Sequence, residues 1–367
     1  MRTIETVGVV GFGVMGAAIG LNAAMAGYKV VFKEMNDELV KAMYDKWVIS
    51  ALKKRVERGK MTQEQMDTVA GLIQGTSQYE DLDVCDLVIE AAVENMDLKI
   101  SIFGELSKAC KKDAILVSNT STFLIEKVMS KVEGQERTAG LHYFFPANVN
   151  KLVEVIRQKA TSDETYNLLM EFASKNGKVA ISVKDFPGFA INPVFIAAYS
   201  VLDSFYDGDK YNVATLDDIS KETLGVRFGV MWVQNGSGLG TAYHAAVSMH
   251  EYLGETDIGF PVAPTSLKEK FEAGESWNLE DGDINTDKEA RKYVAERLLG
   301  AIFAISTQLI EKDVVTEEDL EVGIRTSLAW PKGPFGLMDE MGADEVKRLV
   351  KLVVDGGYFK LPSKFAA

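Results

Sequence analysis

The histidine at position 142 ends an apolar run and lies near a carboxylate that suits acid–base chemistry. His142 stands in the segment Gly140-Leu141-His142-Tyr143-Phe144-Phe145-Pro146, near the end of a predicted apolar strand, and Glu154 sits inside a second apolar run, Leu152–Ile156. A carboxylate in such a run is costly to bury without a partner. If the two runs pair as strands, Glu154 can hold one imidazole nitrogen and leave the other to exchange a proton. A histidine that only satisfies core hydrogen bonds is the competing interpretation.

A glycine-rich segment near the start has the pattern of a dinucleotide-binding turn. Gly11-Phe12-Gly13-Val14-Met15-Gly16 follows an apolar strand and precedes a helix of small residues. The first glycine permits the tight turn, the second admits a pyrophosphate, and the third lets helix and strand pack closely. Val14 and Met15 lead into the predicted helix, whose positive N-terminal end stabilises the phosphates. A glycine turn that binds nothing is the alternative.

Glu34 ends the next predicted strand, 23 residues after Gly11. A carboxylate there accepts hydrogen bonds from the adenosine ribose and repels a 2′-phosphate, so the sequence favours NAD over NADP. Lys33 lies beside it and can weaken that preference.

These residues need a sheet that holds them at one edge. Strands separated by helix-length segments predict a Rossmann-like, doubly wound α/β domain with a mostly parallel sheet, which later hairpins extend. Asp185-Phe186-Pro187-Gly188 then stops the last strand, and an all-α region follows. The predicted strands are 7–10, 29–32, 87–91, 114–118, 138–143, 151–155 and 178–183, and the predicted helices include 17–26 and 37–57.

The helical region contains a weak internal repeat. Thr215–Ile219 resembles Thr316–Leu320, and Gln234–Gly238 stands where the second segment has Pro331–Asp339. Chance similarity is the alternative. We therefore expect three parts: a NAD-binding domain at 1–187 and helical units at 188–285 and 286–367.

Charge and composition exclude several classes of protein. The net charge is -14, and most of it lies in residues 191–367, where 17 Lys+Arg face 29 Asp+Glu, a net of -12. A nucleic-acid partner needs a basic surface, so none is expected. We also expect no membrane span, because no apolar run approaches about 18 residues. Residues 4–10 resemble a core strand rather than a signal peptide, and two cysteines suit a reducing cytoplasm. His244 and His250 lack zinc-ligand spacing, so we expect structural roles and no metal.

The first half strongly resembles the (S)-3-hydroxyacyl-CoA dehydrogenases, including the 3-hydroxybutyryl-CoA type. The resemblance covers nearly all of residues 5–193 and continues more weakly through the C-terminal helices. The matching stretches are Gly11–Gly16, Val88–Asn95, Ser118–Ser121, Gly140–Pro146, Lys151–Val155 and Pro187–Asn192.

The resemblance implies roles for individual residues. His142 is then the general base for the 3-hydroxyl, and Glu154 orients it. Ser121 hydrogen-bonds the substrate oxygen, and Asn192 helps to hold the substrate carbonyl and the histidine. For Ser121 and Asn192 a helix cap is the alternative. The positions that line the ribose and nicotinamide side of the cofactor are Glu94, Lys99 and Asn119.

The substrate side shows one supporting feature and two departures. Lys54, Arg58 and Lys60 belong to the densest basic cluster and match the element that contacts coenzyme A in the family; a solvated helix end is the alternative. Phe145 stands where the family usually has Asn, and Pro193 where relatives often have a polar residue. These departures put the substrate in question more than the reaction.

The expected function is therefore reversible, NAD-dependent oxidation of an (S)-3-hydroxyacyl-CoA in fatty acid β-oxidation. A dehydrogenase of a free hydroxy acid and a catalytically inactive NAD-binding protein are the alternatives. Two helical units in one chain can bury against each other the faces that shorter relatives use to pair. The repeat can then replace the dimer contact, and we expect either a monomer or a homodimer.

Overall fold

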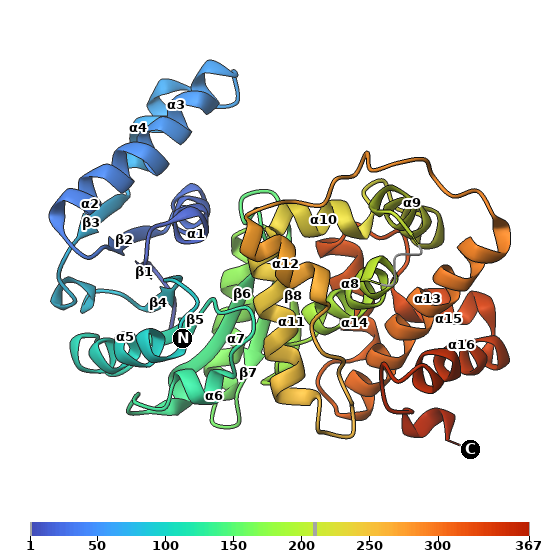
Figure 1. The fold of residues 1–367 in the computed structure, drawn as a ribbon. Helices are drawn as coiled ribbons and strands as arrows, with labels where there is room; N and C mark the ends of the chain where they lie inside the picture. Colours follow the sequence, from blue (N-terminus) through green and yellow to red (C-terminus); the bar gives the residue numbers. More distant parts are fainter. Residues whose placement is uncertain (1, 208–210, 367) are drawn as a thin grey trace. The chain divides into compact units, whose positions relative to one another are not determined.

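The computed structural model describes residues 2–207 and 211–366, which divide into two compact units, Met1–Asp185 and Phe186–Ala367 (Figure 1). The first unit combines a sheet with helices, and the second is helical among its described residues. The outer ends of the predicted domains 1–187 and 286–367, Met1 and Ala367, lie outside the described residues. The three-part division remains a prediction.

The described part of the first unit contains one eight-stranded sheet with the order β3-β2-β1-β4-β5-β6-β7-β8. All neighbours are parallel except β6 and β7, which form the hairpin expected late in the sheet. The predicted Rossmann-like fold is confirmed, and its first six strands have the strand order of dinucleotide-binding domains. The strands are β1 Thr6–Val10, β2 Lys29–Lys33, β3 Ile73–Thr76, β4 Leu87–Glu90, β5 Ile115–Ser118, β6 Thr138–Tyr143, β7 Leu152–Arg157 and β8 Val179–Lys184.

Edge strand β3 was not predicted. Its sequence, Ile-Gln-Gly-Thr, is short and carries one large apolar residue, so it shows no clear period. Strands β4 and β5 in the middle of the sheet are buried at every residue. That burial on both faces explains why these strands were easy to recognise as continuous apolar runs.

Helices of the first unit include one long projecting hairpin. The predicted helix 37–57 is present as α2, a π-helical segment Tyr44–Ile49 and α3 in succession, and α3 turns at Gly59 (φ 65°) before α4. Figure 1 shows α3 and α4 extending away from the sheet. The α-helices are α1 Val14–Met25, α2 Asp37–Met43, α3 Ser50–Glu57, α4 Gln63–Gly71, α5 Met96–Ala109, α6 Ile125–Val128 and α7 Asp163–Lys175, with 3₁₀ turns at Glu80–Leu82 and Gln135–Arg137.

The second unit is built around α13, which packs against α8 and α16. By length and composition α13 is apolar enough to cross a membrane, which our search for apolar runs did not anticipate; 72% of its apolar window is buried inside the protein, as in a core helix. The helices are α8 Ile191–Asp207, α9 Val213–Leu224, α10 Val230–Ser237, α11 Leu239–Leu253, α12 Thr265–Ala273, α13 Lys288–Glu311, α14 Glu317–Ser327, α15 Pro334–Met341 and α16 Ala343–Asp355, with a 3₁₀ turn at Ser363–Phe365.

Helices α9–α11 and α14–α16 have matching local geometry at a constant spacing of 104 residues. Gly229 and Gly333 are the extended N-caps of α10 and α15. In each case a carboxylate from the preceding helix caps the short helix: Asp217 accepts from the Trp232 amide at 3.0 Å, and Glu321 accepts from the Gly336 amide. An added Cβ at either N-cap glycine would lie 2.2 Å from that carboxylate, so neither position has room for a larger residue.

This spacing corrects the repeat alignment made from sequence. Asn212 is the N-cap of α9 and Thr316 the N-cap of α14, so the local geometry favours pairing these two residues, three positions from the predicted pairing of Thr215 with Thr316. The repeat itself remains a prediction. The structural counterpart of 331–339 is 227–235 rather than the segment 234–238. The error arose because both segments were matched on acidic and glycine residues, which are common at helix starts and turns.

Candidate active site

The glycine loop between β1 and α1 has the shape that a pyrophosphate needs. Gly11 has φ 85°, and a Cβ there would lie 2.9 Å from the backbone of Ala92; a Cβ on Gly16 would lie 1.9 Å from the Gly11 carbonyl. Both positions therefore require glycine. At Gly13 an added Cβ would meet nothing within 4 Å, so the backbone faces open space where a phosphate can approach. Val14 and Met15 open α1, whose first amide groups point toward that space.

Glu34 follows β2 and reaches back to the glycine loop. Its Oε1 accepts from the Phe12 amide at 2.7 Å, which holds the carboxylate beside the loop. Lys33 is buried: its ammonium lies 4.3 Å from the centre of the Tyr79 ring and donates to the Glu34 carbonyl at 3.2 Å. Burial lowers the pKa of Lys33, against the raising effect of Glu34. The Lys33 ammonium thus contacts the Tyr79 ring and the Glu34 backbone carbonyl. These contacts hold it in place, so Lys33 is a poor candidate for binding a 2′-phosphate.

A buried ion network lies past the end of β4. Glu90 is fully buried and accepts from Lys99 at 2.7 Å, from the Ala92 amide at 2.7 Å and from the Ser118 hydroxyl at 2.6 Å. Lys99, whose side chain is 1% exposed, also reaches Glu94 at 3.3 Å. Lys99 therefore lies beneath the surface as the partner of two carboxylates. The family resemblance predicts Lys99 along the cofactor, and in the structure its side chain contacts Glu90, Glu94 and the Ala92 carbonyl.

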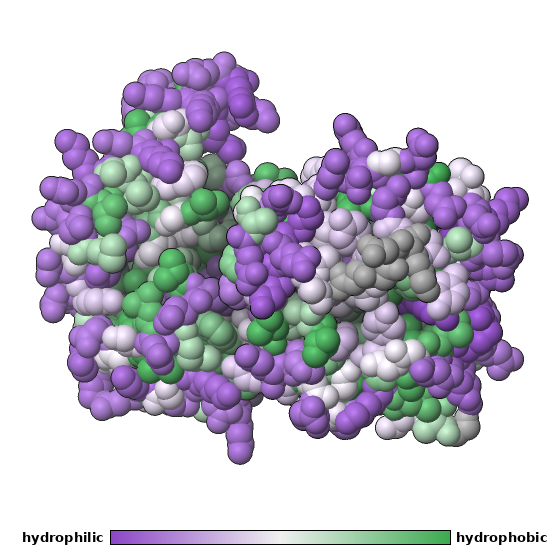
Figure 2. Space-filling model, in the orientation of Figure 1, coloured by the Kyte–Doolittle hydropathy of each residue, from purple (hydrophilic) through white to green (hydrophobic). Residues whose placement is uncertain are grey.

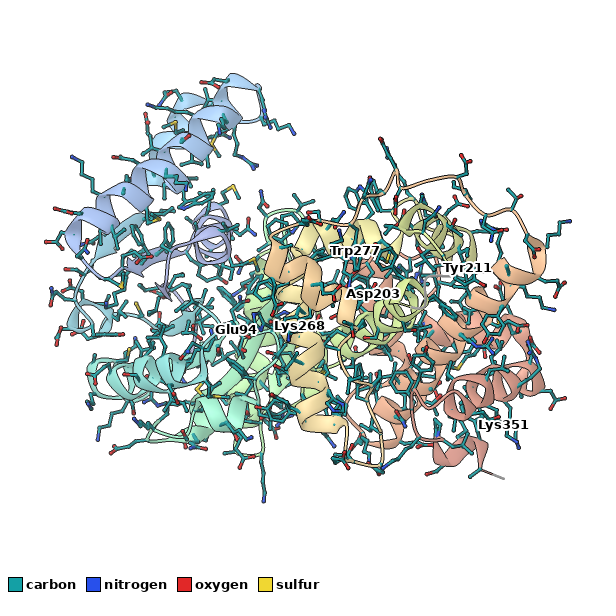
Figure 3. All side chains as sticks on the ribbon, in the orientation of Figure 1. Glu94, Asp203, Tyr211, Lys268, Trp277 and Lys351 are labelled. Carbon is teal, nitrogen blue, oxygen red and sulfur yellow. The ribbon has the colours of Figure 1, made fainter. Side chains whose placement is uncertain are left out.

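Glu94, labelled in Figure 3, lies between β4 and α5 with its side chain 37% exposed. It accepts from the Thr120 hydroxyl at 2.6 Å and from the Ser121 amide at 3.0 Å. Burial pushes the pKa of Glu94 upward, but the Lys99 ammonium and these hydrogen bonds outweigh it, so the pKa lies below the usual range. The carboxylate therefore stays charged at neutral pH.

Ser121 lies on the segment that follows β5, next to Glu94. Its hydroxyl is 3.3 Å from the Glu94 carboxylate, to which it donates. A hydroxyl has one donor and two acceptor sites, so the Ser121 oxygen keeps the capacity to accept from a substrate hydroxyl. Its predicted role fits this chemistry and remains a prediction.

His142 and Glu154 face each other across the β6–β7 hairpin. They are register partners in the antiparallel pair, and the His142 Nδ1 lies 2.7 Å from the Glu154 Oε2. The predicted strand pairing is confirmed. Because Glu154 is fully buried and can only accept when ionised, Nδ1 carries the hydrogen, and Nε2 of the neutral ring is the basic nitrogen.

The loop 144–150 that follows His142 is held from three directions. Asn119 accepts from the Tyr143 amide at 2.9 Å, just before the loop, and Asn22 of α1 donates to the Ala147 carbonyl at 2.9 Å. Lys178 donates to the carbonyls of Ala147, at 2.5 Å, and Asn150, at 2.8 Å. Burial and the nearby Lys151 lower the pKa of Lys178 to about 8.

Phe144 and Phe145 differ in their surroundings. The Phe144 ring packs against the imidazole of His142, with centres 4.5 Å apart. Phe145, at the position where the family usually has Asn, is 54% exposed. An exposed aromatic ring offers apolar surface and no hydrogen bond beside the base.

The remaining predicted residues lie elsewhere. Asn192 is the second residue of α8 in the helical unit, and Pro193 fits the first turn of that helix, where an amide hydrogen is not needed. Lys54, Arg58 and Lys60 are exposed near the turn between α3 and α4, and Figure 2 shows this end of the hairpin covered with hydrophilic residues.

Three supporting residues escaped the sequence analysis: Glu90, Thr120 and Lys178. Glu90 ends an otherwise apolar strand nine residues before Lys99, and such a charged end of a central strand was an available signal. Thr120 and Lys178 gave no sequence signal, because their partners are far away along the chain. Among residues 2–207 and 211–366 no group of three His, Cys, Asp or Glu residues is placed to hold a metal ion.

Comparison with known families matches both units. The model of the 3-hydroxyacyl-CoA dehydrogenase NAD binding domain matches residues 6–186, and that of the 3-hydroxyacyl-CoA dehydrogenase C-terminal domain matches residues 293–363. The second match covers α14–α16 and most of α13. The internal repeat of α9–α11 and α14–α16 rests on local geometry.

Individual relatives agree. A Caenorhabditis elegans protein named a probable 3-hydroxyacyl-CoA dehydrogenase is 34% identical over 249 residues, 66% of this chain and 82% of that protein. The fatty acid oxidation complex subunit alpha of Idiomarina loihiensis is 29% identical over 95% of this chain and 52% of its own length, so this chain spans about half of that relative.

Two solved structures are similar. 3-Hydroxybutyryl-CoA dehydrogenase from Escherichia coli superposes with a TM-score of 0.88 at 22% identity, over 99% of this chain and 98% of that one, which shows a shared fold. FadB2 of M. tuberculosis has a TM-score of 0.70 at 32% identity, over 74% of this chain and 95% of that one.

The position of Glu34 leads to a prediction about cofactor choice. NADH should bind more tightly than NADPH, and Glu34→Gln should narrow the ratio of the two dissociation constants by on the order of tenfold, because the repulsion of the 2′-phosphate is lost. Nicotinamide fluorescence titration measures both constants. Lys33→Met is the matched control and should leave the ratio unchanged. Equal affinity of the unaltered protein for both cofactors would contradict the assignment.

Proposed function

Because the chain belongs to the 3-hydroxyacyl-CoA dehydrogenase family, we propose that it reversibly oxidises an (S)-3-hydroxyacyl-CoA to the 3-oxoacyl-CoA with NAD. The observation that carries the proposal is the buried pair of His142 and Glu154 in the same sheet as the glycine loop. The names of several relatives place such chemistry in fatty acid oxidation, and we propose the same use here.

His142 is the proposed general base. NAD held at the glycine loop would supply the acceptor for the hydride that leaves C3 of the substrate. The C3 hydroxyl loses its proton to Nε2 of His142, and its oxygen becomes the carbonyl oxygen of the product. Glu154 fixes the ring through Nδ1 and balances the charge of the imidazolium that forms. In the reverse direction the same imidazolium returns the proton.

Other residues are proposed to position the reactants. Ser121 accepts from, or donates to, the substrate oxygen, and Asn192 supports the substrate carbonyl and the imidazole. Glu94 and Asn119 border the nicotinamide and ribose side, with Lys99 holding Glu94 from below. Glu34 binds the adenosine ribose beside Gly11, Gly13 and Gly16.

Substitution of the base tests this mechanism. His142→Gln should lower kcat by about 10²–10⁴, the usual contribution of a general acid–base, while the affinity for NADH changes little. The assay follows NADH absorbance with acetoacetyl-CoA. Glu154→Gln should also lower kcat, and His244→Gln is the matched control that should not. Turnover near the unaltered level in His142→Gln would remove the histidine from the mechanism.

The basic cluster at the hairpin turn is proposed to bind coenzyme A phosphates. It is the exposed cationic end of a unit whose residues 1–190 carry 23 Lys+Arg against 25 Asp+Glu. The double variant Lys54→Glu, Arg58→Glu should raise KM for the thioester by about tenfold or more and leave KM for NADH unchanged. Lys108→Glu, Lys112→Glu on exposed α5 and the loop after it is the control with the same change of charge. If both Michaelis constants rise together, the cluster has a structural role instead.

Two other functions share this scaffold. A dehydrogenase of a free hydroxy acid would turn over 3-hydroxybutyrate as well as its thioester, whereas the proposed enzyme prefers the thioester. A catalytically inactive NAD-binding protein would bind NADH without oxidising it in the presence of acetoacetyl-CoA. The basic cluster favours the thioester, and the His142–Glu154 pair favours an active enzyme.

The matched helices α9–α11 and α14–α16 underlie our proposal for assembly. We infer an internal duplication in which the first set covers apolar surface that a second subunit would otherwise cover. Light scattering over a range of concentrations should then give the mass of one chain. A stable dimer joined through residues 190–367 would show that the duplication did not replace the subunit contact.

We also propose a cytoplasmic location. Cys85 and Cys110 are free and buried, and burial raises the pKa of the Cys85 thiol to about 12 and that of Cys110 to about 11. Thiols kept in this form fit a reducing compartment. Cell fractionation tests the proposal, and recovery with an organelle would contradict it.

A further inference from the structure

The helical unit contains a pocket of about 610 Å³ that lies wholly within its own residues. It is lined by α8, by the end of α11 with the segment that leads into α12, and by the segment after α16. Its size falls in the range of small-molecule sites. None of the residues proposed for the dehydrogenase reaction lines it.

A buried hydroxyl with no hydrogen-bond partner in the structure belongs to the lining of this pocket. Ser200, on α8, is 3% exposed, and its Oγ has no hydrogen-bond partner in the structure. Buried hydroxyls are almost always paired, because an unpaired one has lost its hydrogen bonds to water. The neighbouring Ser204, one turn along the helix, is paired with the Tyr358 hydroxyl at 2.6 Å. Ser200 is therefore the group that a ligand in the pocket can satisfy.

His250 and Lys360 add two further polar side chains to the lining, and each makes a hydrogen bond to a backbone carbonyl. The His250 Nδ1 lies 2.9 Å from the Phe260 carbonyl, so this nitrogen carries the hydrogen. Lys360 donates to the Thr256 carbonyl at 2.7 Å. No Asp or Glu lines the pocket, although residues 191–367 have a net charge of -12 (17 basic against 29 acidic). The lining thus includes a basic side chain, Lys360, which also interacts with the Asp257 carboxylate outside the lining.

The rest of the wall is apolar or bare backbone. Phe260 and Phe359 are buried and meet edge to face, with centres 5.4 Å apart and planes at 89°. Val262 is 65% exposed at the wall, and Gly357, where an added Cβ would meet nothing within 4 Å, leaves space open. Such surfaces suit an apolar body rather than a strongly hydrated one.

The polar residues Ser200 and His250 have no polar counterparts at the 104-residue spacing. The positions 104 residues after Ser200 and His250 hold Ala304 and Val354, which can make no side-chain hydrogen bond. A hydroxyl that only filled space could be alanine here too, as it is at position 304. Ser200 and His250 therefore have a role that Ala304 and Val354 cannot have.

We propose that this pocket binds a small carboxylic acid with an apolar chain. The carboxylate accepts from the Ser200 hydroxyl and is attracted by Lys360. The chain packs against Phe260 and Phe359. The site is separate from the one proposed for the thioester, so occupancy of one does not require occupancy of the other.

Isothermal titration of the full chain with octanoate tests the proposal, with 1-octanol as the neutral probe of the same length. Octanoate should bind at least about tenfold more tightly than octanol, because it makes a charge-assisted hydrogen bond. Ser200→Ala should weaken octanoate binding by about tenfold and leave the thermal unfolding midpoint unchanged, since that hydroxyl has no partner to lose.

A charge introduced at the wall gives a second variant. Val262→Glu should weaken octanoate binding further by repulsion, whereas Val84→Glu, at a 56% exposed valine of the other unit, should have no effect. The proposal is overturned if octanoate does not bind at millimolar concentration, if octanol binds equally well, or if neither pocket variant changes the affinity. Competition by acetoacetyl-CoA would also overturn it, because the acid would then occupy the thioester site.

Discussion

The antiparallel pairing of β6 with β7 is the constraint on which the proposed chemistry depends. The sheet is parallel up to β6, and a parallel neighbour would have required a long crossover before the next strand. The short hairpin instead places Glu154 directly opposite His142. A carboxylate fully buried in a strand must have a partner, and the imidazole is that partner. The same bond that satisfies Glu154 therefore orients the base and sets its tautomer.

A second buried network holds the other side of the site. Lys99 lies between Glu90 and Glu94, so the buried ammonium is paired with one buried and one partly exposed carboxylate. Thr120 and Ser121 donate to Glu94, which ties the segment after β5 to the segment after β4. Asn119 extends this connection to β6 through the Tyr143 amide. The acidic network and the histidine hairpin are thus joined by hydrogen bonds at the ends of neighbouring strands.

Sequence patterns identified the features that are determined by residues close together in the chain. The glycine loop, the central strands and the pairing of His142 with Glu154 follow from steric need, continuous apolar runs and the cost of an isolated buried charge. Strand β3 was missed because its pairing with β2, not its composition, makes it a strand. The resemblance assigned Lys99 to the cofactor side because it aligns positions in the sequence, and it gave no sign that the side chain is buried between two carboxylates. Lys178 was invisible because its partners, the carbonyls of Ala147 and Asn150, have no side-chain signature.

Comparison of α9–α11 with α14–α16 shows which residue types both sets of helices keep. Both keep a carboxylate on the first helix, an N-cap glycine on the short helix and a left-handed residue between them, Gly225 (φ 66°) and Ala329 (φ 55°). A helix of eight residues gains little from its own hydrogen bonds, so a carboxylate at its positive end contributes a large part of its stability. That requirement is the same in both sets. Ser200 on α8 and Ala304 on α13, which have the same 104-residue spacing but lie outside the two sets, are under no such constraint, and there the residue types differ.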